Sequence, residues 1–420
     1  MKGGTLKSRR SNAGDEEEAA GEHSSSSSSF PATARKEHCW SSSGLLKAAA
    51  AVVILMAGVL IGLAASANMS RYYYYSTVTL GSSSSSLQQR QEQGANSEGT
   101  VVAGHNSQQE TSGFRRFVEG GGAARRMSDA ELFWVASMVP RMEYPFERVP
   151  KVAFLFLTRG PLPLAPLWER FFQGHEGLYS VYVHALPGYA GRHRRSSPFY
   201  GRQIPSQEVS WGSITLVDAE KRLLANALLD WRNQRFVLVS ESCAPVFNFR
   251  TVYEYLVNSA HSYVESYNMD VPQCAGRYNP AMAPDVREEQ WRKGSEWFEL
   301  SRDLAVDVVA EQRYYALFRR HCTPSCYPDE HYIPTYLHLR HAARNANRTL
   351  TWVDWSRGGP HPARFGRASV TPEFVAAIRG NATTCLYNAR PTTVCYLFAR
   401  KFAPSALPML LNLTTTLLHF

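Results

Sequence analysis

The chain has 420 residues, a formal net charge of +9, 44% hydrophobic residues and only 19% charged residues. This much apolar surface excludes a wholly disordered chain, and the length allows one large domain or two ordinary ones. The 45 basic residues exceed the 36 acidic ones without forming a basic arm, which disfavours a histone-like nucleic-acid binder and points to an anionic ligand.

The N-terminal part predicts a membrane anchor. Residues 1–47 are polar and serine-rich, and we expect a disordered cytosolic tail. Residues 48–67 are uncharged and mostly apolar, about the length that crosses a bilayer as a helix. A cleaved signal peptide is the alternative, but its apolar region starts close to the first methionine. Basic residues before the span (Arg35, Lys36, Lys47) outnumber those soon after it (Arg71), which predicts a single-pass type II protein with its bulk in the secretory lumen.

Residues 68–126 are rich in Ser, Gln and Gly, and we expect a flexible luminal stem that leads to an ordered domain over residues 127–420. Four glycosylation sequons agree with a luminal address; they begin at Asn68, Asn347, Asn381 and Asn412.

Seven cysteines divide between the two sides of the predicted span. Cys39 falls on the reducing side, and six cysteines on the luminal side allow up to three disulfides. A metal site at Cys322 and Cys326 is the weaker alternative, because no second pair stands at a matching spacing.

The ordered domain predicts an α/β fold. Ser128 and Glu131 form a capping box before a short helix that ends by Pro140. Strands and helices then alternate; the strands are expected at 151–158, 178–186 and 235–240, and the helices at 167–172 and 218–231. This order predicts a parallel sheet with helices on both sides, and ligands in such sheets bind at the carboxyl ends of the strands. Thr158 and Arg159 lie at one of these ends.

Two adjacent cations near the C-terminus are candidates for binding a diphosphate. Arg400 and Lys401 follow an apolar, strand-like run over 394–398. Arginine can bind phosphate oxygens as a bidentate donor and lysine as a point charge. A solvated loop is the alternative, and Arg379 and Arg390 are further cations nearby. The ordered region has no Asp-x-Asp motif, so we expect cationic side chains rather than a metal to neutralise a diphosphate.

A carboxylate pair and two tryptophans are the other candidates. Asp329 and Glu330 follow Pro328 at a predicted helix start, where a carboxylate is stabilised and Glu330 could serve as a general base. Helix capping alone is the alternative for both. Trp297 and Trp352 lie beside charged residues, as in sites that stack on sugar rings, and core packing is the favoured alternative for both.

Eight sequence blocks occur in order between Ser128 and Pro408, among them KVAFLFLTRGPLPLAPLWERFF, VLVSESCAPVFNF, GRYNPAMAP, QWRKGSEWFEL, CYPDEHYIPTYL and CYLFARKFAP. Together they closely resemble the plant members of the core-2/I-branching β-N-acetylglucosaminyltransferase-like family, which include the brittle-culm type. The resemblance implies a type II Golgi glycosyltransferase with a GT-A-like fold, a Rossmann-like mixed sheet flanked by helices, that inverts configuration and needs no metal.

The resemblance also implies residue roles. Glu330 matches the catalytic base and Lys401 the diphosphate-binding lysine. Arg379 is the first choice for the partner arginine, with Arg390 or Arg400 as alternatives. Val353 matches a nucleotide-side valine, and Trp355 and Arg287 match acceptor-side residues. Two departures, Ala185 in place of an aspartate that contacts the nucleotide and Ala403 after Phe402, leave the donor sugar open.

The expected function is therefore transfer of a sugar, N-acetylglucosamine or a related one, from a UDP-sugar to a glycan or glycoprotein acceptor in the Golgi lumen. The partners are these two substrates and the membrane, with no nucleic acid and no cofactor. A catalytically inactive Golgi protein that keeps the fold to bind glycans or act as a scaffold is the alternative.

Overall fold

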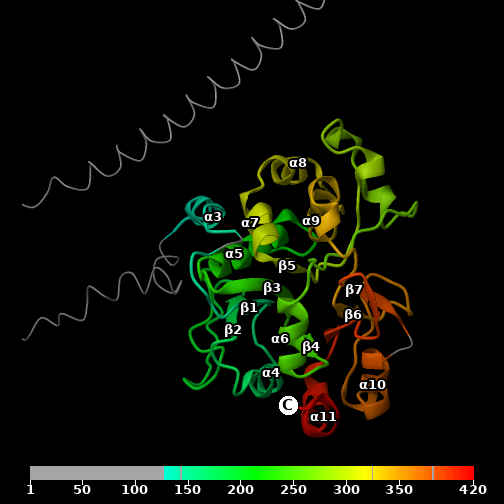
Figure 1. The fold of residues 1–420 in the computed structure, drawn as a ribbon. Coiled ribbons are helices and arrows are strands. Elements are labelled where there is room, and N and C mark those ends of the chain that lie inside the picture. The colour runs from blue at the N-terminus through cyan, green and yellow to red at the C-terminus, as the bar shows by residue number, and fades with distance from the viewer. Residues whose placement is uncertain (1–126, 142–143, 324, 381–382) are drawn as a thin grey trace, which may run out of the picture. The chain divides into compact units, whose positions relative to one another are not determined.

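The computed structural model describes residues 127–141, 144–323, 325–380 and 383–420 (Figure 1). The predicted tail, span and stem, and with them Cys39, Asn68 and the sequon residue Asn381, lie outside these residues. Over the described ranges, no helix combines the length and the apolar character that a membrane crossing requires.

The central sheet has the strand order β2-β1-β3-β5. Its strands are β1 (Lys151–Leu157), β2 (Tyr179–His184), β3 (Asn233–Ser240) and β5 (Glu299–Ser301). Every residue of β1 is buried, as its continuous apolar run predicts, because it pairs in parallel with β2 on one side and β3 on the other. Leu157 is in register with both His184 and Ser240, so the three carboxyl ends meet at one edge. The predicted parallel core is confirmed, and β5 adds an antiparallel edge.

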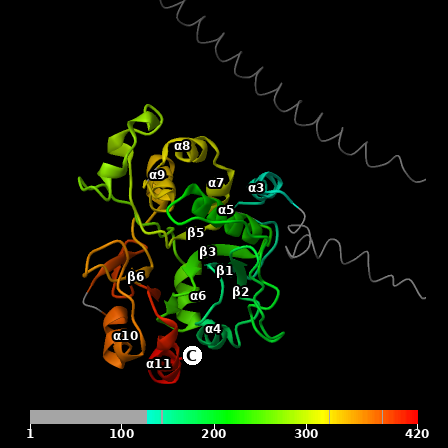
Figure 2. The ribbon, with the colours of Figure 1, turned by 180° about the vertical axis from the view of Figure 1, so that it is seen from behind.

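Helices cover both faces of this sheet (Figures 1 and 2). On one face lie α3 (Asp129–Ser137), α5 (Ile214–Leu228) and α7 (Arg302–Ala310); on the other lie α4 (Ala165–Phe172) and α6 (Phe249–Val257). The predicted capping box is present, since Glu131 N donates to Ser128 Oγ while Ser128 N donates back to the Glu131 carboxylate. The helices α8 (Arg313–His321) and α9 (Pro328–Arg340) follow α7.

A second, smaller sheet joins distant parts of the chain. It contains β4 (Ala244–Pro245), β9 (Phe398–Arg400) and β6 (Thr351–Val353), with β9 in the middle, antiparallel to β4 and parallel to β6. The Phe398 ring lies 6.2 Å from the Phe154 ring and 6.1 Å from the Trp168 ring, centroid to centroid. The two sheets therefore share one aromatic core.

The C-terminal region adds α10 (Pro372–Gly380), the hairpin β7 (Cys385–Tyr387) and β8 (Arg390–Thr392), α11 (Leu407–Leu413) and a π-helical turn over Thr414–Leu418. Short 3-10 turns complete the fold at Ala275–Arg277, Pro280–Met282, Glu288–Gln290, Ala342–Arg344, Arg367–Ser369 and Pro404–Ala406. The strand expected from Val394 begins only at Phe398, because the preceding segment is tied to the hairpin by a disulfide at Cys395.

Two disulfides form, Cys322–Cys326 and Cys385–Cys395, while Cys243 and Cys274 are buried free thiols. The pairing of Cys322 with Cys326 rules out the metal alternative for these two residues. The sequon residues Asn347 and Asn412 are both exposed. A mixed sheet with helices on both faces fits the expected GT-A-like fold.

Candidate active site

The start of α9 carries the carboxylate predicted to act as the base. The helix begins directly after Tyr327, which adopts a left-handed conformation (φ 56°), and Pro328 occupies its first turn. Glu330 is partly exposed, and its Oε2 accepts hydrogen bonds from Arg277 Nη1 and Lys293 Nζ, each at 2.6 Å. We call Glu330, Asp329, Glu296, Arg277 and Lys293 the carboxylate side of the site.

The other carboxyls on this side favour their protonated forms. Burial, with the charge of Glu330, raises the pKa of Asp329 to about 7. Burial, with the charge of Asp329, raises the pKa of Glu296 to about 8, and the nearby Arg400 opposes that shift. Behind them, Glu220 is fully buried, neither of its carboxyl oxygens has a hydrogen-bond partner among the described residues, and burial raises its pKa.

A second group, which we call the cation side, consists of Arg159, Arg364, Arg400 and Lys401. Burial lowers the pKa of the half-buried Lys401, and the charges of Arg400, Arg159 and Arg364 lower it further, while Glu241 opposes them. Within the described ranges, none of the four forms an ion pair. Such a group of unpaired cations is suited to a diphosphate.

Arg400 and Val353 link this side to the smaller sheet. Val353 in β6 is in register with Arg400 in β9, and Trp355 follows it, half-exposed. The Arg400 guanidinium carbon lies 4.0 Å from the centroid of the Trp297 ring, and its Nε has no hydrogen-bond partner in the described structure. Trp297 is buried, as core packing predicts, yet one face of it supports a site cation. Since Trp297 follows Glu296 in the chain, the contact of Arg400 with Trp297 connects the two sides.

Four other predicted site residues lie outside the contacts described so far. Arg379 donates to the carbonyl of Leu417 and lies 4.5 Å from the centroid of the Phe247 ring, so its guanidinium faces the C-terminal segment. Arg390 is exposed on β8. Arg287 is exposed and pairs with Glu289. Thr158 is buried, and its Oγ1 donates to the carbonyl of Gly160 at 3.1 Å. Among the candidate arginines, the structure places Arg400 beside Lys401.

Sequence reasoning missed Arg277, Lys293, Glu296 and Arg364 as site residues. Lys293 and Glu296 lie in the segment QWRKGSEWFEL and Arg277 in GRYNPAMAP, which supplied a signal for the fold but none for these side chains. Their roles depend on contacts between distant segments, such as Arg277 with Glu330.

An open groove of about 500 Å³ adjoins the carboxylate side. It is lined mostly by polar and aromatic residues, among them Arg277, Tyr278, Asn279 and Tyr327. Its volume falls within the roughly 300–1,000 Å³ that is typical of ligand sites. Arg277 belongs both to the groove wall and to the ion pairs of Glu330, so this one side chain connects the groove to that carboxylate.

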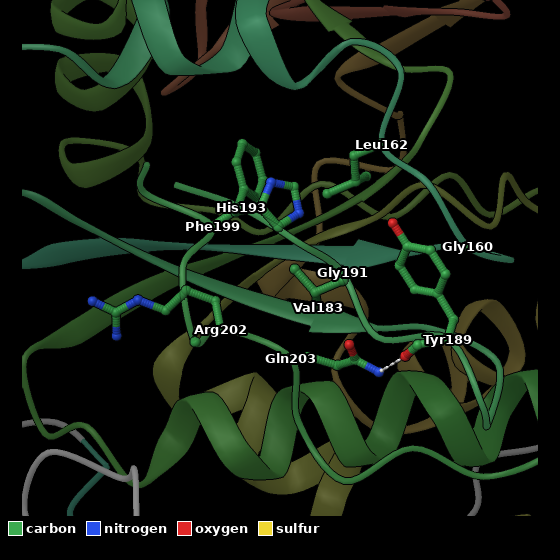
Figure 3. A pocket seen from close by; sticks show the side chains of 10 residues that line it. Gly160, Leu162, Val183, Tyr189, Gly191, His193, Phe199, Arg202 and Gln203 are labelled. Carbon is green, nitrogen blue, oxygen red and sulfur yellow. Dashed lines mark hydrogen bonds between the residues drawn. The ribbon is translucent and has the colours of Figure 1, made fainter. Parts of the chain in front are cut away.

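A second cavity, at the ends of β1 and β2, is too small for a substrate (Figure 3). It encloses about 70 Å³ between Gly160, Tyr189, His193 and Arg202, and Gln203 closes it by donating to the Tyr189 carbonyl at 2.8 Å.

In the described part of the chain, no three His, Cys, Asp or Glu side chains gather as metal ligands.

The mixed α/β domain thus combines a carboxylate in the first turn of α9, Glu330, with cations at and after the end of β9, Arg400 and Lys401, and such a combination suits an enzyme that acts on an anionic donor. A family model for the Core-2/I-Branching enzyme matches residues 152–379, more than half of the chain. The chain therefore belongs to this family of glycosyltransferases, as its sequence blocks predict.

One relative is Glycosyltransferase BC10 of rice (Oryza sativa subsp. japonica). It is 36% identical over 310 residues, which cover 63% of this chain and 76% of the rice protein. This similarity confirms the predicted resemblance to the brittle-culm type.

Proposed function

We propose that this chain is an inverting, metal-independent glycosyltransferase that moves a sugar, N-acetylglucosamine or a related one, from a UDP-sugar to a glycan or glycoprotein acceptor. Its place of action is the Golgi lumen, where the span over residues 48–67 anchors it as a type II protein. The observation that supports this proposal is the presence in one domain of a carboxylate held by two cations, Glu330, and of a group of cations without carboxylate partners in the described structure around Lys401.

In the proposed reaction an acceptor hydroxyl attacks the anomeric carbon of the donor sugar. The new bond joins the acceptor oxygen to that carbon, the bond from the carbon to the diphosphate breaks, and Glu330 takes the hydroxyl proton. Attack from the face opposite the leaving group gives inversion and a β-linkage. The acceptor occupies the groove beside Arg277, with Trp355 and Arg287 as further acceptor contacts.

The negative charge that grows on the departing UDP is stabilised by Lys401 with Arg400, and Arg159 and Arg364 add to the positive field. Fixed charges of this kind stabilise a transition state without reorganisation. Their lack of carboxylate partners supports a role in anion binding. Val353 lies beside Arg400, which supports its place on the nucleotide side.

The test compares Glu330→Gln with the wild-type full-length chain, purified in detergent and screened with UDP-sugars and plant glycans. Loss of the base is expected to slow transfer by about 10²–10⁴-fold, and EDTA is expected to leave wild-type transfer unchanged. Glu254→Gln, on α6, is a matched control because it removes an exposed carboxylate whose ion-pair partner, Arg250, is exposed as well.

Undiminished transfer by Glu330→Gln, or loss of wild-type transfer in EDTA, would contradict the mechanism. A wild-type chain that binds glycans yet neither releases UDP nor transfers sugar would favour the inactive, glycan-binding alternative.

A further inference from the structure

The two oxygens of Glu330 have different surroundings. Oε2 accepts from both Arg277 and Lys293 at 2.6 Å, whereas Oε1 has no hydrogen-bond partner among the described residues. Both cations are largely buried, with side-chain exposures of 18% and 15%, so water screens these ion pairs only partly. One oxygen is therefore fixed and the other is available to a ligand.

Lys293 is held in place by α9 itself. The preceding residue, Arg292, donates its backbone N–H to Thr335 Oγ1 at 3.0 Å and accepts from His331 Nδ1 at 2.8 Å through its carbonyl. The following residue, Gly294, donates to the carbonyl of Glu330 at 2.8 Å. Three hydrogen bonds thus attach this segment to the first turns of the helix that carries Glu330, and they fix the Lys293 ammonium beside the carboxylate.

Only glycine fits at position 294. A Cβ built there would lie 1.8 Å from the carbonyl oxygen of Glu265, far inside van der Waals contact. The segment on the other side is equally close, since Tyr267 and Lys293 exchange both backbone hydrogen bonds at 2.8 Å. This close packing keeps Lys293 at a fixed distance from α9.

Arg277 reaches Glu330 from another segment of the chain. It ends a 3-10 turn, its guanidinium carbon lies 4.2 Å from the centroid of the Tyr327 ring, and it lines the groove of about 500 Å³. A ligand in the groove can therefore contact Arg277 while Arg277 holds the base.

The other titratable groups that face Glu330 or its two cations are Glu265, Tyr267, Glu296, Asp329 and His331. Burial raises the pKa of Glu265, raises the pKa of Asp329 to about 7 and that of Glu296 to about 8, and lowers that of His331 to about 3. Glu330 alone among these carboxyls contacts two cations directly.

We propose that Arg277 and Lys293 are positioning residues for the base: they hold Oε2 of Glu330 in place and leave Oε1 to take the acceptor proton. This inference rests on the proposed function. Arg277 also lines the groove, so it couples acceptor binding to the orientation of the base, whereas Lys293 affects only the base.

The test measures kcat, the KM for each substrate and the pH dependence of kcat for Lys293→Met and Arg277→Met in the full-length chain. Each variant is expected to lower kcat by about 10–100-fold and to move the acid limb of the pH profile about one unit higher, because a carboxylate that loses a cation is protonated more readily. Only Arg277→Met is expected to raise the KM for the acceptor as well.

The variants that keep the positive charge, Lys293→Arg and Arg277→Lys, should have the acid limb of the kcat–pH profile at its wild-type position. Arg250→Met removes one member of the exposed Arg250–Glu254 ion pair and should leave kcat and the pH profile unchanged. A purely structural role would lower kcat without moving the acid limb, and that result would overturn the proposal.

The two proposals can fail separately. If the wild type transfers sugar and Glu330→Gln does not, but both methionine variants keep the wild-type pH profile, the positioning role of Arg277 and Lys293 is wrong and the proposed function stands. If the wild type transfers nothing, the proposed function fails, and the positioning role is then tested by following the titration of the Glu330 carboxyl with ¹³C NMR. An unchanged titration midpoint in both methionine variants would overturn it.

Discussion

The carboxylate side and the cation side of the site use charge in opposite ways. On the carboxylate side, the charge of Glu330 is met within the protein by Arg277 and Lys293, and hydrogen bonds fix the segment that carries Lys293. On the cation side, Lys401 and three arginines have no carboxylate partners in the described structure, and burial, together with repulsion from the arginines, lowers the pKa of Lys401. Charges paired inside the protein position a side chain, whereas unpaired charges of one sign favour an external ligand.

The largest expected effect tests the rigidity of the carboxylate side. Gly294→Ala places a Cβ against the Glu265 carbonyl, so either this segment or α9 must move. We expect a loss of about 3 kcal/mol or more in the free energy of unfolding, measured by urea denaturation.

Gly380→Ala is the matched control, because a Cβ at position 380 meets no atom within 4 Å. It should change the free energy of unfolding by no more than about 0.5 kcal/mol. Equal stability of the two variants would show that the carboxylate side tolerates displacement.

The second prediction tests the cation side. Lys401→Met is expected to lower kcat/KM by about 100-fold and to weaken UDP binding in calorimetry, because a charge that faces the diphosphate is lost. The free energy of unfolding should not fall, since Lys401 has no ion pair to lose within the described ranges. Lys401→Arg should retain part of the affinity. Wild-type affinity for UDP in the methionine variant would argue against the cation side as a ligand site.

The third prediction concerns pH and the buried Asp329. Its pKa of about 7 lies above the ordinary value of 3.8, so the folded state binds an extra proton between these values. This stabilisation is present at low pH and is lost as the pH rises from about 4 to about 7, by an amount on the order of 2–4 kcal/mol. Asp329→Asn cannot ionise, so its stability should fall less between pH 5 and pH 8.

Urea denaturation at the two pH values gives the measurement. Glu373→Gln, which alters an exposed carboxylate on α10, should keep the wild-type difference. If Asp329→Asn also keeps it, Asp329 is ionised in the folded protein at pH 5.

The smallest effects distinguish the three candidate arginines. Arg400→Met should weaken UDP binding by about 10-fold, or about 1.4 kcal/mol, because Arg400 lies beside Lys401. Arg379→Met should weaken UDP binding less, since the Arg379 guanidinium contacts the Leu417 carbonyl and the Phe247 ring. Arg390→Met should weaken UDP binding least, because Arg390 is exposed on β8. The reverse order in UDP titrations would move the diphosphate site toward α10.

The sequence predicted the fold well where the signal is local. The capping box at Ser128, the buried strand from Lys151 and the helix after Pro328 are all confirmed, because each depends on residues within one element. The strand near the C-terminus was expected too early, since hydrophobicity alone does not reveal that Cys395 bonds to the neighbouring hairpin.

The site was predictable only in part, for a related reason. Glu330 and Lys401 come from short, recognisable motifs, and Arg400 lies next to Lys401. Arg277 and Lys293 precede Glu330 by dozens of residues, and only the folded chain shows that they share one carboxylate oxygen. Arg379 was preferred on spacing along the chain, and spacing does not report which way a side chain on α10 points.

The small sheet of β4, β9 and β6 has a consequence for gene variants. Its central strand comes from the last part of the chain, so Arg400 and Lys401 are translated after the central sheet and Glu330. A premature stop codon shortly before Phe398 would leave the message for β1, β2, β3 and Glu330 intact. Its product would lack both cations and the strand that joins the two sheets, so such an allele should behave as a loss of function despite encoding most of the domain.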